Sequence, residues 1–239
     1  MKQLISFPAV LMLVMCLSSS SALAALILPS NFAMTINNGL AQTTVTENDL
    51  NLTGPDGNLF NTTGAQQTGM WMYAWNFDLD PDPLVSGSFT FTNLTPNDVN
   101  VSILLHLPIN APFVPGLQSG SFSGSFKDQN NSGAASLQNV TWDGLIDGSS
   151  TFNIFAFDAS CSGSPPGCMG SVFSIDPDPE IYGPGVSSSI GTEIALTLSA
   201  GDQATLNTTF EVVPVPVPGA ALLFWTGLAT MFGWRWGRG

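Results

Sequence analysis

Positive charge is almost absent from this sequence. Four lysines and arginines and one histidine stand against 17 acidic residues, which gives a formal net charge of −13. Binding to phosphate backbones requires clustered lysine and arginine, so nucleic acid is excluded as a natural partner. Charged residues of both signs make up only 9% of the chain, whereas 44% of its residues are hydrophobic. There is therefore enough apolar material for a core, and wholesale disorder is not expected.

Helical periodicity is also missing. Between residues 25 and 213 no stretch shows a long apolar period of 3.6 residues. Apolar and polar residues alternate instead, most clearly from Trp71 to Phe77, and such alternation places one side of a strand on a core. Further strands are expected at 88–92, 101–107, 121–126, 137–142, 151–157, 171–175, 193–198 and 204–213. Many short strands separated by turn-rich clusters predict an all-β domain at 25–213, an antiparallel β-sandwich of jelly-roll-like type.

No apolar run near the start of the chain is long enough to span a bilayer as a helix. Lys2 precedes an apolar run from Leu4 to Leu17, which is followed by serines and by the small-x-small sequence Ala22-Leu23-Ala24. A positive start, a short apolar run and such a site are the three parts of a secretory signal peptide. We therefore expect residues 1–24 to be removed after export.

The other end of the chain combines prolines, an uncharged run and arginine. Valine and proline alternate from 213 to 218, which predicts a stiff, extended spacer. The segment 219–234 that follows carries no charge and would span about 24 Å as a helix, which is marginal for a bilayer core of about 30 Å. Arg235 and Arg238 follow it and favour the cytoplasmic side. We expect a single transmembrane helix at 219–234; the alternative is a buried C-terminal helix of the domain.

This order of segments resembles the PEP-CTERM sorting signal of Gram-negative bacteria. Pro216, Val217 and Pro218 correspond to its Pro-x-Pro box, 219–234 to its helix, and Arg235 and Arg238 to its basic tail. Val217 replaces the glutamate of the commonest pattern, so that the segment is closer to a Val-Pro-Leu-Pro-Ala-like subtype.

The resemblance implies a route and a destination for the protein. Its partner would be exosortase, a membrane enzyme that recognises the tail at 214–239 and cuts it near the box. Before processing, the tail would anchor the domain in the inner membrane. Afterwards the domain would reach the cell surface or an exopolysaccharide matrix, as a structural or adhesive component and not as an enzyme.

Cysteine is scarce, and its placement agrees with export. Cys16 lies in the predicted signal peptide, so Cys161 and Cys168 remain, on either side of a turn-rich loop. Two cysteines in an oxidising compartment most simply form a disulfide. The alternative is a pair of zinc ligands, for which no further cysteine or nearby histidine completes a set of four.

The predicted domain is strongly acidic. It contains all 17 acids and one base, Lys127, which gives it a formal charge of −16. Self-repulsion of this size favours a soluble monomer and attracts cations. Two Asp-Pro-Asp-Pro runs concentrate the acids, and we expect both to form stiff turns at strand ends.

Calcium is the cofactor that these two runs suggest, because it requires oxygen ligands held in rigid loops. The candidate ligands are the acids of the runs and of their flanks: Asp78, Asp80, Asp82, Asp176, Asp178 and Glu180. Alternation along the first run would turn its three aspartates to the same side. The alternative is that aspartate and proline are ordinary turn residues that need no ligand.

Two further functions stay open at this point. An exposed platform for stacking sugars could be built from Trp71, Tyr73, Trp75 and Trp142, although aromatic residues in alternating strands are more often core. A secreted hydrolase could use Asp143, Asp147, Glu180 and Glu193 as paired carboxylates, or the single histidine, His106, as a base. We expect His106 to face solvent, opposite Val101, Ile103 and Leu105.

Overall fold

The computed structural model describes residues 31–39, 41–52, 59–109, 112, 116–163, 168–169, 173–175 and 181–215. The predicted signal peptide, the predicted helix and the sorting residues lie outside this part of the chain: 1–24, 219–234, Pro216, Val217, Pro218, Arg235 and Arg238. Within the part that is described, no helix is long and apolar enough to cross a membrane.

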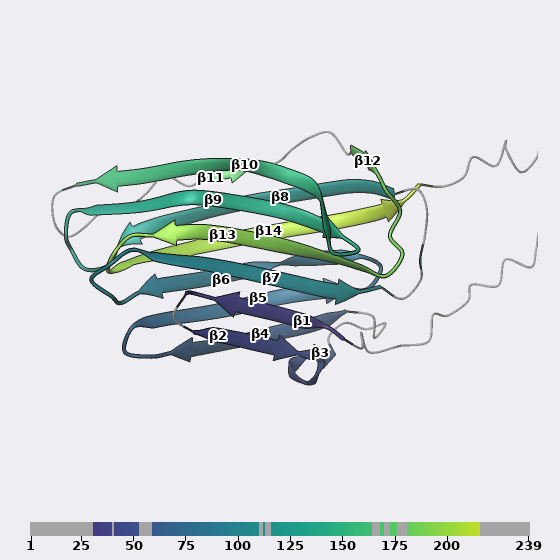
Figure 1. The fold of residues 1–239 in the computed structure, drawn as a ribbon, viewed down its shortest axis with the longest axis horizontal. Helices are drawn as coiled ribbons and strands as arrows, with labels where there is room; N and C mark the ends of the chain where they lie inside the picture. Colours follow the sequence, from purple (N-terminus) through teal and green to yellow (C-terminus); the bar gives the residue numbers. More distant parts are fainter. Residues whose placement is uncertain are drawn as a thin grey trace, which may run out of the picture.

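Two antiparallel β-sheets pack face to face as a sandwich (Figure 1), which confirms the predicted all-β fold. The six-stranded sheet has the order β10 (Ser149–Ser162), β9 (Ala134–Ile146), β13 (Ser189–Leu198), β7 (Val99–Pro108), β1 (Ala33–Asn37), β2 (Gln42–Thr46). The eight-stranded sheet has the order β11 (Phe173–Ile175), β8 (Gly116–Asp128), β14 (Asp202–Pro214), β6 (Leu84–Asn93), β5 (Trp71–Asp80), β4 (Phe60–Gln67), β3 (Asn51–Leu52), with β12 (Ile181–Gly183) also on β8. A 3-10 turn at Glu47–Asp49 follows β2.

The apolar layer between the sheets is built by alternation along each strand. In β8, Phe122 and Phe126 are buried in this layer, whereas the serines between them lie on the outer side. The described residues of all nine segments predicted to be strands lie in β5 to β11, β13 and β14. Four short strands near the start of the chain, β1 to β4, and the three-residue strand β12 were not predicted from the sequence.

The chain enters β1 and leaves β14 at the same end of the sandwich, on the right in Figure 1. We call this the tail end, because Val215 leads from it into the predicted sorting segment. The opposite end, the far end, holds the connections β4–β5, β6–β7, β8–β9 and β13–β14 (Figure 1). Every surface feature can therefore be placed relative to the tail.

Asp147 links the β9–β10 turn to the start of β13 at the tail end. Asp147 and Gly148 have φ values of 51° and 76° and form the two-residue β9–β10 turn, for which Asp-Gly is a favoured pair. The Asp147 carboxylate accepts hydrogen bonds from the backbone N–H groups of Ser187, Ser188 and Ser189, and the shortest bond from each N–H measures 2.7–3.1 Å. It also accepts hydrogen bonds from the hydroxyls of Ser187 and Ser188. Desolvation would raise the pKa of Asp147, but these hydrogen bonds outweigh it and hold the pKa well below its usual range.

Replacing Asp147 by asparagine should lower the free energy of unfolding at pH 7 by about 1–2 kcal/mol, because the charged acceptor is lost while the turn is kept; the figure allows for solvent screening. Because the pKa of Asp147 is lower in the folded state than in the unfolded state, its charge stabilises the fold at pH values above the unfolded-state pKa of about 3.9. This contribution is lost as the pH falls below that pKa. Denaturant unfolding at pH 7 and pH 2.5 should therefore show a difference between wild type and Asp147→Asn that shrinks in acid. The control, Asp82→Asn, alters an exposed carboxylate. An equal difference at both pH values would contradict the role of the charge.

Candidate binding site

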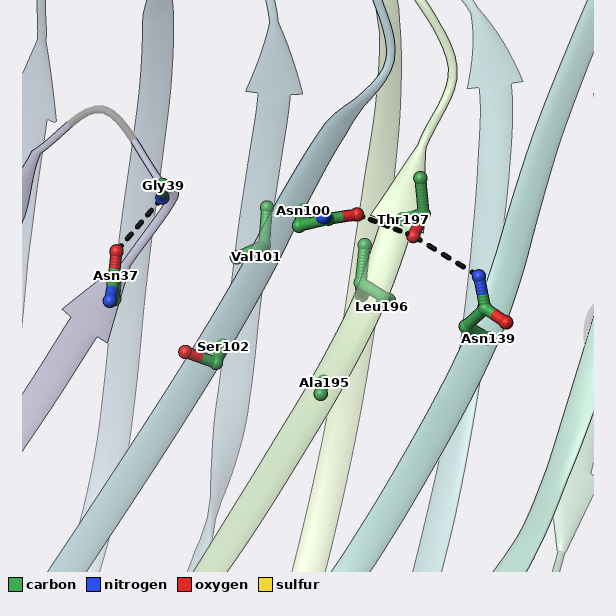
Figure 2. Close-up of a pocket in the computed structure, with 9 residues that line it drawn as sticks. All are labelled: Asn37, Gly39, Asn100, Val101, Ser102, Asn139, Ala195, Leu196 and Thr197. Atoms are coloured by element: carbon green, nitrogen blue, oxygen red, sulfur yellow. Dashed lines mark hydrogen bonds between the residues drawn. The ribbon is translucent and has the colours of Figure 1, made fainter.

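A shallow hollow of about 410 Å³ lies on the outer face of the six-stranded sheet (Figure 2). Four strands or their ends contribute to it: β1, β7, β13 and β9. Its lining consists of Asn37, Gly39, Asn100, Val101, Ser102, Asn139, Ala195, Leu196 and Thr197. Val101 and Leu196 turn their side chains into the core, so that the polar side chains and Ala195 face the hollow from outside.

An irregularity in β9 shapes this hollow. Ala195 pairs with Thr141 but Thr197 pairs with Gln138, so β9 has one residue more than β13 between these pairs. Asn139 lies within this bulge with a φ of 51°, and its N–H donates to Asp158 Oδ1 at 2.7 Å instead of to the sheet. Bulges of this kind redirect a side chain and interrupt pairing.

Three of the polar side chains form a chain of hydrogen bonds across the hollow. The Thr197 hydroxyl donates to Asn100 Oδ1 at 2.7 Å and accepts from Asn139 Nδ2 at 3.4 Å (Figure 2). Among the described residues, Asn100 Nδ2 and Asn139 Oδ1 form no hydrogen bond of their own. The hollow thus offers a free donor and a free acceptor on either side of a fixed hydroxyl.

Sequence reasoning did not identify these residues as a site. Asn100, Thr197 and Asn139 come from three strands that are far apart in the sequence, and none belongs to a motif. One signal was present: Leu137, Val140 and Trp142 are all buried, so the alternation of β9 slips by one residue between the first two. Such a slip is typical of a bulge.

Three of the residues predicted for a hydrolase, His106, Asp143 and Glu193, lie on the outer face of the six-stranded sheet. His106 is on the outer face of β7 with Ser102 and Leu104, as predicted, and its strand neighbours are Ala33 and Gly191. Asp143 and Glu193 are opposite each other on β9 and β13, and Asp143 accepts hydrogen bonds from Ser150 and Asn153, both at 2.7 Å. Asp147 is engaged in its turn, and Glu180 lies outside the described residues.

The expectation that the strand aromatics are core is confirmed for three of the four residues, and the alternative of an exposed aromatic platform does not hold for them. Trp71, Tyr73 and Trp142 are buried, because they lie on the inner side of their strands. Trp142 donates its indole N–H to Thr208 at 2.5 Å, and Trp71 stacks on Tyr73 with 4.6 Å between ring centroids. Trp75 is half-buried and packs over Gly64, where an added Cβ would lie 2.3 Å from its ring.

Two aspartates of the first Asp-Pro run, Asp78 and Asp80, lie on the outer side of β5, as alternation along a strand predicts. Asp82 is exposed in the turn that follows. Asp78 accepts from Asn61 and Asp80 accepts from the Asp82 N–H, each at 2.9 Å. Desolvation raises the pKa of Asp80, with the charge of Asp82 acting in the same direction.

The calcium site itself stays a prediction. No group of three potential metal ligands comes together among the residues that the structure describes. The second run, with Asp176, Asp178 and Glu180, lies outside that part of the chain.

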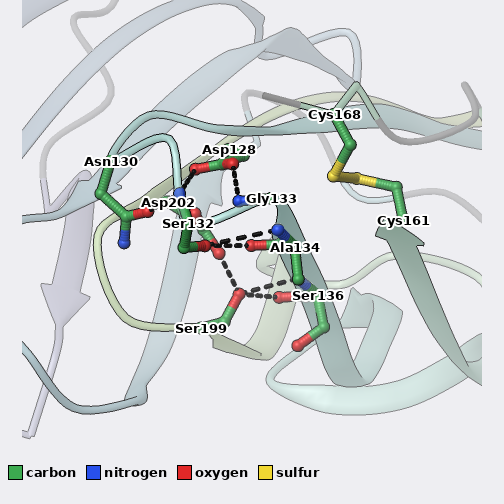
Figure 3. The surroundings of a disulfide bond; sticks show 10 residues. All are labelled: Asp128, Asn130, Ser132, Gly133, Ala134, Ser136, Cys161, Cys168, Ser199 and Asp202. Atoms are coloured by element: carbon green, nitrogen blue, oxygen red, sulfur yellow. Dashed lines mark hydrogen bonds between the residues drawn. A yellow bond between two sulfur atoms is a disulfide. The ribbon is translucent and has the colours of Figure 1, made fainter. Parts of the chain in front are cut away.

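The predicted disulfide between Cys161 and Cys168 is confirmed (Figure 3). Cys161 belongs to β10, an outer strand of the six-stranded sheet, whereas the Cys168 carbonyl accepts the N–H of Asp128 in β8 at 2.9 Å. The bond therefore connects the two sheets at the far end. Gly163 adds a hydrogen bond to Gly133, so the same region is also held to the β8–β9 turn.

Two buried aspartates lie beside this connection (Figure 3). Asp128 accepts the N–H groups of Ser132 and Gly133, at 3.2 and 2.7 Å. Asp202 accepts the hydroxyl of Ser199, but its Oδ1 is buried and has no hydrogen-bond partner among the described residues. Burial raises the pKa of Asp202, and the charges of Asp128 and Asp98 raise it further, while the Ser199 hydroxyl and the backbone N–H of Gln129 oppose the rise.

No protein-family model and no curated protein matches this chain.

Reduction of the disulfide should lower the free energy of unfolding by about 2 kcal/mol, near the small end of the usual range because the closed loop is short. Urea unfolding with and without dithiothreitol measures this loss. The double variant Cys161→Ser/Cys168→Ser should match the reduced protein and should not respond to the reductant. If reduction leaves the unfolding midpoint unchanged, the bond does not stabilise the connection between the sheets.

Replacing Asp202 by asparagine should stabilise the protein at pH 7. The pKa of Asp202 is higher in the folded state than the value of about 3.9 in the unfolded state. The free energy of unfolding therefore falls as the pH rises from the unfolded-state pKa through the folded-state pKa. Asparagine does not titrate and removes this dependence. Denaturant unfolding at pH 4 and pH 7 should show an advantage of Asp202→Asn that is larger at pH 7.

Asp128→Asn is the matched control in the same region. It should destabilise by about 1 kcal/mol at pH 7, because Asp128 accepts two backbone N–H groups. Equal effects of the two substitutions would contradict the separate roles assigned to these aspartates.

Proposed function

We propose that this protein is an exported bacterial surface or exopolysaccharide-matrix protein of structural or adhesive type, which an exosortase processes at its C-terminus. Residues 1–24 would direct export, and residues 214–239 would hold the protein in the inner membrane until processing. Within the tail, Pro216, Val217 and Pro218 would form the recognised box, and Arg235 and Arg238 the basic end.

The observation that carries this proposal is the position of the chain ends. The described chain enters and leaves the sandwich at its tail end, and Val215 passes there into the proline-alternating segment (Figure 1). A body attached in this way presents its far end and both outer faces away from the point of attachment. This is the geometry that a displayed or released domain requires.

A non-enzymatic role is part of the proposal. It is supported by the lining of the hollow, which consists of amide and hydroxyl side chains, Ala195, Gly39 and backbone. Such groups suit binding better than proton transfer, which needs side chains that titrate near the working pH.

The jelly-roll-like description of the sandwich and a stabilising role for calcium belong to the same proposal. The first is supported by chain connections that cross repeatedly between the sheets, at β6–β7, β8–β9 and β13–β14. The second is supported by the placement of Asp78 and Asp80 on the same outer side of β5.

Intact-mass analysis of the protein from its native host tests the processing. We expect a mass that lacks residues 1–24, lacks the residues after a cut near Pro218, and is lower by two hydrogens because of the disulfide. Deletion of residues 219–239 should leave the signal-peptide cut unchanged and abolish membrane retention. A mature protein that retains residues 219–239 would overturn the proposed sorting.

A further inference from the structure

We propose that the hollow on the outer face of the six-stranded sheet binds a neutral saccharide through Asn100, Asn139 and Thr197. The inference deepens the proposed adhesive role and rests on it. It replaces the aromatic platform, whose rings are mostly in the core, with a site made of amides and a hydroxyl on the outer face of the six-stranded sheet.

The hydrogen-bonding groups of the hollow match those of a sugar. A saccharide hydroxyl donates one hydrogen bond and accepts others, so neighbouring hydroxyls need both donors and acceptors. Among the described residues, Asn100 Nδ2 is a free donor and Asn139 Oδ1 a free acceptor, while the Thr197 hydroxyl bonds Asn100 at 2.7 Å and Asn139 at 3.4 Å. The short bond to Thr197 orients the Asn100 amide before the ligand arrives, which lowers the entropic cost of binding.

The charge around the hollow selects for a neutral ligand. Its lining contains no lysine, arginine, histidine, aspartate or glutamate among the described residues. The domain as a whole carries a formal charge of −16 and repels polyanions such as uronic-acid polymers. A cationic ligand would find no carboxylate among the lining side chains. The uncharged polyhydroxyl compounds remain as the class that fits.

Size and shape favour one or two sugar rings. The volume of about 410 Å³ falls within the usual range of small-molecule sites, about 300–1,000 Å³. Ala195 lies on the outer side of β13, between Ser102 on β7 and Thr141 on β9. Its small side chain leaves the middle of the hollow open. The hollow is open on one side, so we expect weak binding at a single site, with a dissociation constant on the order of 1 mM.

The experiment is an amide-resolved NMR titration of the full chain in detergent micelles. The probes are tetrasaccharides of glucose and of N-acetylglucosamine, with tetragalacturonate as the anionic comparison. We expect at least one neutral probe to shift the signals of residues lining the hollow, Asn100, Asn139 and Thr197 among them. Tetragalacturonate should cause no such shifts.

Matched variants separate the site from general effects on the fold. Ala195→Leu should abolish binding by filling the hollow, and Thr197→Val should weaken it at least fivefold. The controls are the same substitutions on the outer face of the other sheet, Ala74→Leu in β5 and Thr205→Val in β14. Thr205 is a matched position because its hydroxyl forms a side-chain hydrogen bond with Thr90, as the Thr197 hydroxyl does with Asn100. Both controls should bind like the wild type.

Three results would overturn the inference: no shift with any neutral probe, shifts confined to other surfaces, or equal weakening by the control variants. Binding of tetragalacturonate as strong as that of the neutral probes would also overturn it. The titration does not depend on processing of the tail, which intact mass reports separately. Failure of the saccharide site can therefore be told apart from failure of the proposed sorting.

Discussion

Each sheet of this protein has to supply one face to the apolar layer between the two, and the positions of the other groups follow from that requirement. Trp142 from β9 packs edge-on against Phe210 of β14 in the opposite sheet, with 6.0 Å between ring centroids. Glycines make room for these rings: an added Cβ at Gly120 would lie 2.6 Å from Trp142, and one at Gly144 would lie 2.5 Å from Phe210. Most of the large aromatic side chains that the structure describes are thereby committed to the interior, whereas Tyr182 is exposed. Any recognition at the hollow would fall to asparagine, serine and threonine side chains.

The scarcity of positive charge imposes a second requirement. With one lysine and no arginine in the domain, its carboxylates have almost no cation to pair with. They are satisfied instead by N–H and hydroxyl donors: Asp147 by three serines, Asp128 by Ser132 and Gly133. Hydrogen bonds to ionised groups are stronger than neutral ones, so these carboxylates can hold turns in place. Asp202 departs from this pattern, since one of its oxygens is buried and has no donor among the residues that the structure describes.

The strands that the sequence predicted are those in which apolar alternation is strong, such as β5 and β7. Strands β2, β3 and β4 were missed because they lie toward one edge of each sheet and carry little of the core, whereas β1 buries Met34 and Ile36 but is only five residues long. In β2 only Val45 is fully buried, and β4 buries Phe60 and Thr62 while its remaining residues are polar or small. The short distance between Cys161 and Cys168 in the sequence made the disulfide predictable. The hollow could not be predicted, because it depends on how β7, β13 and β9 align across about 100 residues of chain and on a bulge at Asn139.

A weak site on an open sheet face can still serve adhesion when many copies of it are held together. The hollow lies toward the far end, since it includes Asn37 and Gly39 at the end of β1 and Asn100 near the start of β7. Attachment at the tail end would keep this region directed away from the point of anchoring. Molecules displayed side by side, or fixed in a matrix, would meet a polysaccharide with many equivalent hollows. Once one hollow has bound the polymer, the neighbouring hollows meet it at a high effective concentration. The overall affinity then exceeds that of one site by factors of about 10²–10⁴, without any new contact within the hollow. On this argument, low affinity of the isolated domain and firm retention in a polymer matrix are compatible properties of the same surface.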